Sequence, residues 1–287
     1  MVPAVPKYEY QIAGVSIVLE TDRVLATEDI FRPFITKNCK EDFRAVFRQV
    51  DRLPMIEDTV LWEDRCYRVH SDGKDGYLRS FFDAPRDLTA YAVATYDDTY
   101  HLINVEYLEK GARCVSEMRN SFFHLGLETL LLRRERVCLH AACVETAVGG
   151  ILFSGPSGIG KTTQAELWCR YRGARLINGD LPILEKTQTG WRAWSSPFAG
   201  SSQCHLNECC GVTAIVKLRQ ASENRLRRLD QAEAFRAVWS GLTVNRWSRW
   251  CSEKACDLAV ELVQQIPVYE LSCTADLRAV EVLEQGL

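Results

Sequence analysis

The sequence predicts an α/β protein with a β-rich antiparallel N-terminal domain over residues 1–110 and an α/β domain with a mixed sheet over residues 111–287. Three observations lead to this prediction. The length of 287 residues suits two domains, at roughly 100–200 residues each. Strand patterns dominate up to about residue 108, and helix and strand patterns alternate after it.

Composition excludes several other classes of protein. Hydrophobic residues make up 47% and charged residues 25% of the chain, as in ordinary globular proteins. The net charge of −3 provides no basic field, so we expect neither a nucleic acid nor a membrane as partner. No apolar stretch approaches the roughly 18 residues that a membrane helix needs, and the first residues lack the apolar run of a signal peptide.

The twelve cysteines include no CxxC pair. Disulfide frameworks belong to small secreted chains, so reduced thiols and a cytoplasmic protein are expected here. One cluster contains residue types that ligate zinc, although without the usual spacing of zinc ligands, and it consists of Cys204, His205, Cys209 and Cys210. A metal site in this cluster is the less favoured alternative.

In the N-terminal domain, residues 14–20 are rich in β-branched side chains and predict a strand. Two hairpins are predicted, the first from residues 66–70 and 77–82 and the second from residues 91–96 and 100–108. The domain contains no recognisable chemical motif, and recognition of an acceptor is the role left open for it.

The second region combines longer helical patterns with buried-type strands. A glycine at position 173 predicts the end of one helix. In chain order, the expected elements are a helix over 115–133, strands over 137–145 and 151–154, a helix over 161–171, a strand over 174–178, a hairpin over 181–185 and 191–195, a strand over 212–218, helices over 231–241 and 252–265, a strand over 268–273 and a helix after Thr274.

The most informative segment lies between the strand over 151–154 and the helix that follows it. It matches GxxxxGK[ST] in full, with the residues Gly155, Pro156, Ser157, Gly158, Ile159, Gly160, Lys161 and Thr162. Thr163 follows the motif directly. Glycines let backbone N–H groups converge on phosphate oxygens, and the helix N-terminus adds its positive dipole end. In such loops the lysine reaches the β- and γ-phosphates and the hydroxyl ligates Mg²⁺. The sequence therefore predicts binding of ATP and Mg²⁺.

An early acidic residue favours a kinase among proteins with this loop. Asp180 follows the first strand after the loop's helix, so we expect it to emerge beside the phosphates. There it could ligate Mg²⁺ or accept a proton from an attacking hydroxyl. A simple turn role is the alternative, since Asn178 and Gly179 are turn formers.

The strand before the loop is the second arm of a hairpin whose first arm contains His140-Ala141. Together with the loop and the stretch Gly173 to Asp180, this arrangement resembles the HPr kinase/phosphorylase family, which shares its core with ATP-dependent phosphoenolpyruvate carboxykinases. The resemblance covers roughly residues 136–218. It implies that Asp180 is the base toward the acceptor hydroxyl, near the metal, and that His140 assists it.

Two departures from that family stand out. Gly179 occupies the place of the first residue of the family's acidic pair, and residues 195–202 replace the Arg-Gly-Leu-Gly segment linked to the phosphorylase reaction. Residues 195–202 are either a flexible acceptor-binding loop or an ordinary connection. The layout is closer to HPr-kinase-like enzymes that modify ribosomal peptides, such as lasso-peptide kinases.

The resulting prediction is ATP-dependent phosphoryl transfer to a hydroxyl, on a serine or threonine of a peptide or small protein. The expected catalytic residues are Asp180, His140 and Lys161, and the expected metal ligands are Thr162 and Asp180. Two alternatives stay open, a small-molecule kinase of the shikimate or gluconate kind and a non-catalytic ATP-binding switch. The sequence also leaves open a homo-oligomer.

Overall fold

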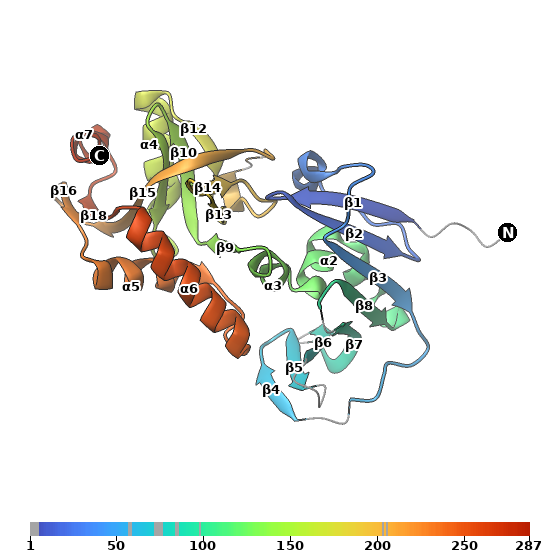
Figure 1. Cartoon of the computed structure of the whole chain (residues 1–287). Coiled ribbons are helices and arrows are strands. Elements are labelled where there is room, and N and C mark those ends of the chain that lie inside the picture. Colours follow the sequence, from blue (N-terminus) through green and yellow to red (C-terminus); the bar gives the residue numbers. More distant parts are fainter. Residues whose placement is uncertain are drawn as a thin grey trace. The chain divides into compact units, whose positions relative to one another are not determined.

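The computed structural model describes residues 6–56, 59–71, 77–83, 86–97, 99–202, 204 and 206–287. It is a mixed α/β protein with two mixed sheets, and the chain divides into two compact units, residues 1–130 and 131–287 (Figure 1). The division falls after Leu130 and not at the expected residue 110. The reason is that helix α2 (Met118–Leu125) packs into the first unit, where Phe122 contacts the rings of Tyr10 and Phe31.

The first unit is built on an eight-stranded sheet in the order β1-β2-β3-β8-β7-β6-β5-β4. Its elements are β1 (Lys7–Ile12), β2 (Val15–Thr21), η1 (Asp29–Phe34), β3 (Phe43–Gln49), β4 (Val60–Glu63), β5 (Tyr67–Ser71), β6 (Tyr77–Asp83), β7 (Asp87–Tyr96), β8 (Leu102–Tyr107), η2 (Glu109–Gly111), α1 (Ala112–Ser116) and α2 (Met118–Leu125).

Both predicted hairpins are confirmed, as β5–β6 and β7–β8, although residues 72–76 and 98 of their turns lie outside the described residues. The expectation of an antiparallel sheet is wrong. Strand β3 pairs in parallel with both β2 and β8. The long connection over residues 22–42, which includes η1, lets the chain cross over before β3, and a parallel pair requires such a crossover.

The single helix expected over residues 115–133 is three short helices, α1, α2 and α3 (Leu127–Leu132). The chain is extended at Glu117 and left-handed at Gly126, where φ is 67°. At the end of α2, the buried Arg79 donates a hydrogen bond to the carbonyl of Phe123. This contact satisfies one of the carbonyls that a helix end leaves unpaired.

His124 is a buried titratable group in the core of the first unit. Its Nε2 lies 2.9 Å from the Tyr91 hydroxyl and its Nδ1 contacts the carbonyl of Asn120. The ring is packed edge-on to Phe81. Burial lowers the pKa of His124 from 6.5 to about 3.

This lowered pKa predicts a loss of stability in mild acid. The unfolded chain takes up a proton at His124 below about pH 6.5 and the folded chain does not, so stability falls as the pH drops. The free energy of unfolding should fall by about 2 kcal/mol from pH 7 to pH 5 through this group, measured by chemical denaturation. His124→Gln should lose that pH-dependent component, whereas a change at the exposed His101 should retain it. A full pH dependence in His124→Gln would contradict the assignment.

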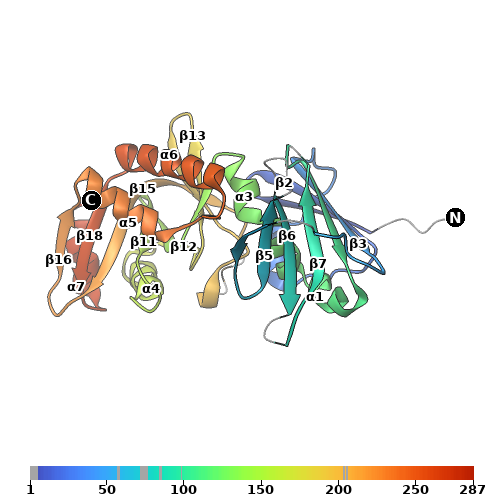
Figure 2. The same ribbon diagram turned by 90° about the horizontal axis from the view of Figure 1, so that it is seen from below.

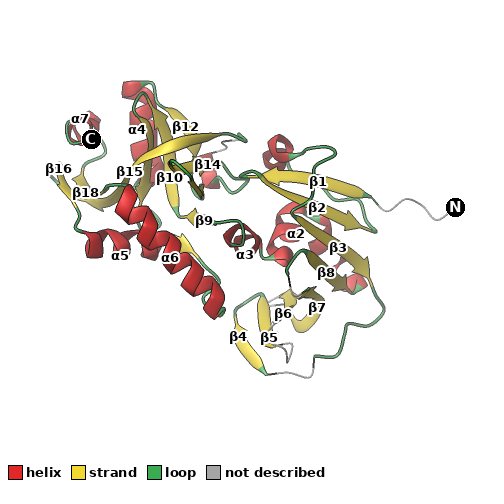
Figure 3. Ribbon diagram, viewed as in Figure 1, coloured by secondary structure: helices red, strands yellow, loops and turns green. Residues whose placement is uncertain are grey.

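The second unit is built on a ten-stranded mixed sheet, whose strands are drawn in yellow in Figure 3. In this sheet β12-β10-β11-β15-β14-β13-β9-β17 form one path, and β18 and β16 extend from β15. Its elements are β9 (Arg136–Leu139), β10 (Ala141–Thr146), β11 (Gly149–Ser154), α4 (Lys161–Arg172), β12 (Arg175–Asn178), β13 (Ile183–Thr187), β14 (Gly190–Trp194), η3 (Gly200–Ser202), β15 (Cys209–Gln220), β16 (Arg225–Arg228), α5 (Gln231–Gly241), β17 (Leu242–Thr243), α6 (Arg249–Gln265), β18 (Val268–Cys273) and α7 (Leu277–Glu284).

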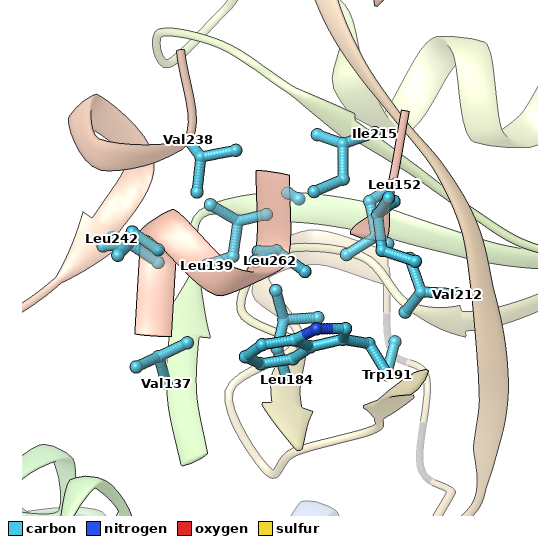
Figure 4. Packing of buried hydrophobic residues seen from close by; sticks show 14 of the residues in the cluster. Val137, Leu139, Leu152, Leu184, Trp191, Val212, Ile215, Val238, Leu242 and Leu262 are labelled. Carbon is cyan, nitrogen blue, oxygen red and sulfur yellow. The ribbon is translucent and has the colours of Figure 1, made fainter. Parts of the chain in front are cut away.

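Helices α4 and α6 cover opposite sides of this sheet (Figure 2). Leu262 of α6 packs with Leu184 and Trp191 in one buried cluster, which Figure 4 shows from close by. Trp168 of α4 packs with Phe153 in the other cluster. The predicted helix over 161–171 is confirmed, and Gly173 ends it in the left-handed conformation.

The twelve cysteines all lie in the described part of the chain, and none of them forms a disulfide there. No helix among the described residues is both long and apolar enough to cross a membrane.

Candidate active site

The loop after β11 has the backbone that its glycines predict. Gly155, Gly158 and Gly160 have φ values of 147°, 78° and 108°, in the region that favours glycine. A Cβ atom at Gly158 or Gly160 would meet nothing within 4 Å, so the space beside the loop is open. The predicted context is confirmed, with β11 before the loop and α4 after it. Such a backbone can present its N–H groups to an anion.

Lys161 begins α4, and its side chain turns back onto the loop. Its Nζ lies 2.9 Å from Nε2 of His140 and donates to the carbonyls of Gly155 and Pro156 at 3.1 and 3.2 Å. Burial lowers the pKa of Lys161, and the charge of Asp180 opposes that effect. An ammonium group has three donors, so these contacts occupy all of them. A bound triphosphate would have to compete for them.

His140 lies at a sharp change in the path of the chain. The single strand predicted over residues 137–145 is wrong, because the chain forms two strands that join different neighbours. Strand β9 pairs with β13 and β17, and β10 pairs with β11 and β12. Between them, the N–H of His140 donates to the carbonyl of Gly241, and the carbonyl of His140 accepts from the Ser154 hydroxyl. The backbone of this residue is therefore fixed from two sides.

Asp180 is positioned by an Asn at the end of β12. The Oδ1 atom of Asn178 accepts hydrogen bonds from the N–H groups of Asp180 and Leu181, at 2.9 and 2.8 Å. This is an Asx turn. The carbonyl of Asp180 accepts from the N–H of Ala141, and its Oδ1 lies 3.1 Å from Nδ1 of His140. Because about 40% of the Asp180 side chain stays exposed, an acceptor could reach it.

The three predicted catalytic side chains therefore form one chain of contacts, Lys161–His140–Asp180. The protonation of His140 can be inferred from its neighbours. A charged lysine only donates, so Nε2 of His140 must accept, and the ring proton then lies on Nδ1. That proton points to the carboxylate of Asp180. Through this contact the imidazole holds one carboxylate oxygen in place.

The other predicted loop residues lie around this chain of contacts. Ile159 packs against the core cluster beneath the loop. Thr162 is half-buried and Thr163 is exposed, both in the first turn of α4, while Pro156 and Ser157 are exposed. Asn178 was expected only as a turn former, and the role of Gly241 was not predicted. The Asn178-Gly179-Asp180 spacing could have revealed the Asx turn, but the contact of Gly241 with His140 is long-range and has no local signal.

Steric crowding explains why position 179 is a glycine. A Cβ atom there would lie 2.3 Å from Cβ of Ser202 and 3.0 Å from the carbonyl of Ala199, so no larger side chain fits unless this segment moves. The same segment presents Gly200 to Asp180, where an added Cβ would lie 2.9 Å from the aspartate Cβ. A second carboxylate at position 179 is therefore incompatible with this arrangement.

Ser195 and Ser196, at the start of the 195–202 segment, are fully buried. The Ser196 hydroxyl donates to the carbonyl of Leu181 at 2.6 Å. Burial and this hydrogen bond hold the start of the segment in place, as expected of an ordinary connection.

Gly179→Ala should lower the free energy of unfolding by about 1–3 kcal/mol, the usual cost of overpacking. Denaturant unfolding measures it. Gly211→Ala is the matched control, because a Cβ there meets nothing within 4 Å and its φ is not left-handed. Equal stability of the two variants would contradict the packing argument.

The cysteine cluster weighed as a zinc site includes His205, which lies outside the described residues. The Cys204 thiol donates to the carbonyl of Ile177, and the Sγ atom of Cys210 lies 3.8 Å from the Sγ atom of Cys143. Within the described ranges, no three His, Cys, Asp or Glu side chains are grouped to hold a metal ion.

Comparisons with known proteins give structural similarity but no match in sequence. No protein-family model matches the sequence, and no curated protein matches it. Among solved structures, the chain is similar to the HPr(Ser) kinase/phosphatase from Coxiella burnetii, with a TM-score of 0.33 and 12% sequence identity. The aligned region covers 52% of this chain and 94% of that one.

Proposed function

We propose that this protein is an ATP-dependent kinase that transfers the γ-phosphoryl group to a hydroxyl, on a serine or threonine of a peptide or small protein. The observation that carries the proposal is the contact chain Lys161–His140–Asp180, which begins on the phosphate loop and ends on a half-exposed carboxylate. It combines an anion-binding loop, a cation and a base within hydrogen-bond reach of one another.

The loop fits a triphosphate. Its open glycine backbone and the N-terminus of α4 favour negative charge, and Lys161 adds a cation that can move from the loop carbonyls to the phosphates. The Thr162 hydroxyl and the Asp180 carboxylate are hard oxygen donors of the kind that Mg²⁺ takes, and one carboxylate with substrate phosphates and water is a normal shell for it. Mg²⁺, when bound, neutralises charge on the phosphates.

The transfer step follows from the roles of these side chains. The acceptor hydroxyl is oriented by Asp180, which takes its proton as the oxygen attacks the γ-phosphorus. The new O–P bond forms, the bond from that phosphorus to the β–γ bridging oxygen breaks, and ADP leaves. Lys161 and the loop N–H groups stabilise the charge on the transferring group. His140 donates from Nδ1 to Asp180 and keeps it in place.

Incubation with γ-labelled ATP, Mg²⁺ and serine- or threonine-containing peptides tests the proposal. Mass spectrometry should find a phosphate ester on a peptide hydroxyl. Transfer to a small alcohol from a metabolite panel, and to no peptide, would favour the small-molecule kinase. Binding of ATP without transfer to any acceptor would favour the non-catalytic switch.

A further inference from the structure

A cleft of about 600 Å³ lies in the second unit, between the β10–β11 turn, the β13–β14 turn, the start of β15 and the end of α6. Gly149, the first residue of β11, lines it, whereas the phosphate loop follows the last residue of that strand. The cleft therefore lies at the other end of β11 from the candidate active site. Neither the phosphate loop nor the proposed kinase reaction uses it.

One wall of the cleft contains a glycine that the fold does not need. Gly211 lies within β15, where glycine weakens a strand. A Cβ atom there would meet nothing within 4 Å, and its φ is not left-handed. The nearby Gly149 and Gly150 differ, because a Cβ on them would lie 2.5 Å from Thr213 and 2.6 Å from Cys210. A strand glycine without such a reason marks a bulge or a close approach by a ligand or another backbone. The register shift in this strand comes after Gly211, between Val212 and Ala214, so Gly211 itself is open to a ligand.

The polar groups of the cleft indicate the charge of that ligand. Arg192 is the one charged residue among the lining residues, and it is exposed and pairs with Gly211 across β14 and β15. It forms no ion pair within the described ranges. An exposed guanidinium without a carboxylate partner suits an acceptor with negative charge.

The rest of the lining suits an organic body. Val148, Val212 and Ile266 supply apolar surface, and Thr189, Thr213 and Gln265 supply neutral polar groups. A free metal cation has no carboxylate or thiolate here to bind, since none lines the cleft.

We propose that this cleft binds a small organic anion, with its charged group on Arg192, its apolar body against the three aliphatic residues and its edge close to the backbone at Gly211. The shared chemistry is a compact anionic group, either a carboxylate or a phosphate. The proposal is independent of the proposed kinase function.

The test uses benzoate, phenyl phosphate and neutral benzyl alcohol as probes in ligand-observed NMR titrations. The full chain would carry Lys161→Ala, so that the phosphate loop does not contribute binding of its own. We expect at least one anion to bind and the neutral alcohol to bind at least tenfold more weakly. Which anion binds more tightly distinguishes a carboxylate ligand from a phosphate ligand.

Variants then locate the binding. Arg192→Gln changes an exposed side chain and should weaken anion binding at least tenfold, whereas Arg228→Gln, at an exposed arginine on β16, should not. Gly211→Val should remove binding without lowering the melting temperature, because its side chain enters open space. Binding of neither anion, or equal binding in Arg192→Gln and Arg228→Gln, would overturn the proposal.

Discussion

Asp180→Asn should lower kcat for phosphoryl transfer by about 10²–10⁴-fold, the usual contribution of a general base. The amide oxygen can still accept the Nδ1 proton of His140, so the site keeps its geometry, but an amide cannot take the acceptor's proton. The dissociation constant of ATP should change much less than kcat. Single-turnover transfer and calorimetric ATP binding measure the two effects separately.

Asp257→Asn provides the matched control, because this aspartate is exposed on α6. It should transfer phosphate at the rate of the unmodified protein. If Asp180→Asn also retained that rate, Asp180 would not be the base, and the proposed role of His140 would fail with it.

Lys161→Met should lower kcat/KM for ATP by about 10²–10³-fold, the size expected for loss of a donor that stabilises transition-state charge. The unbranched methionine can occupy the same buried space, since Lys161 is 7% exposed, but it has no donor for phosphate. ATP binding should weaken as well, because the cation is lost in both the ground state and the transition state.

Lys186→Met tests whether the loss of any lysine would lower kcat/KM for ATP and weaken ATP binding. Lys186 lies on β13 and pairs with Glu261, away from the loop in the sequence. Its ATP kinetics should be unchanged. A normal ATP affinity and a normal rate of phosphoryl transfer in Lys161→Met would mean that the loop does not bind the phosphates through this lysine.

Local patterns predicted much of the fold. The strand–loop–helix around Lys161, the end of α4 at Gly173 and both N-terminal hairpins are encoded by residues close together in the sequence. The parallel pairing of β3 could not be predicted, because it depends on where the chain returns after a long connection. The break of the long helix at Glu117 has no glycine or proline to mark it.

The sequence predicted which residues form the candidate site, but it could not predict their geometry. The loop motif pointed to Lys161, the position after the first strand beyond the loop's helix pointed to Asp180, and the resemblance added His140. Their contacts depend on the bend at His140, which is held by the carbonyl of Gly241 about a hundred positions away in the chain (241 − 140 = 101). Gly179 is likewise explained only by the segment ending at Ser202. Long-range packing of this kind leaves no local pattern.

A structure with a non-hydrolysable ATP analogue and Mg²⁺ tests the central claim most directly. The account predicts that Lys161 leaves the carbonyls of Gly155 and Pro156 to contact the β- and γ-phosphates, and that the terminal phosphate faces Asp180. An empty loop, or a terminal phosphate directed away from Asp180, would contradict it.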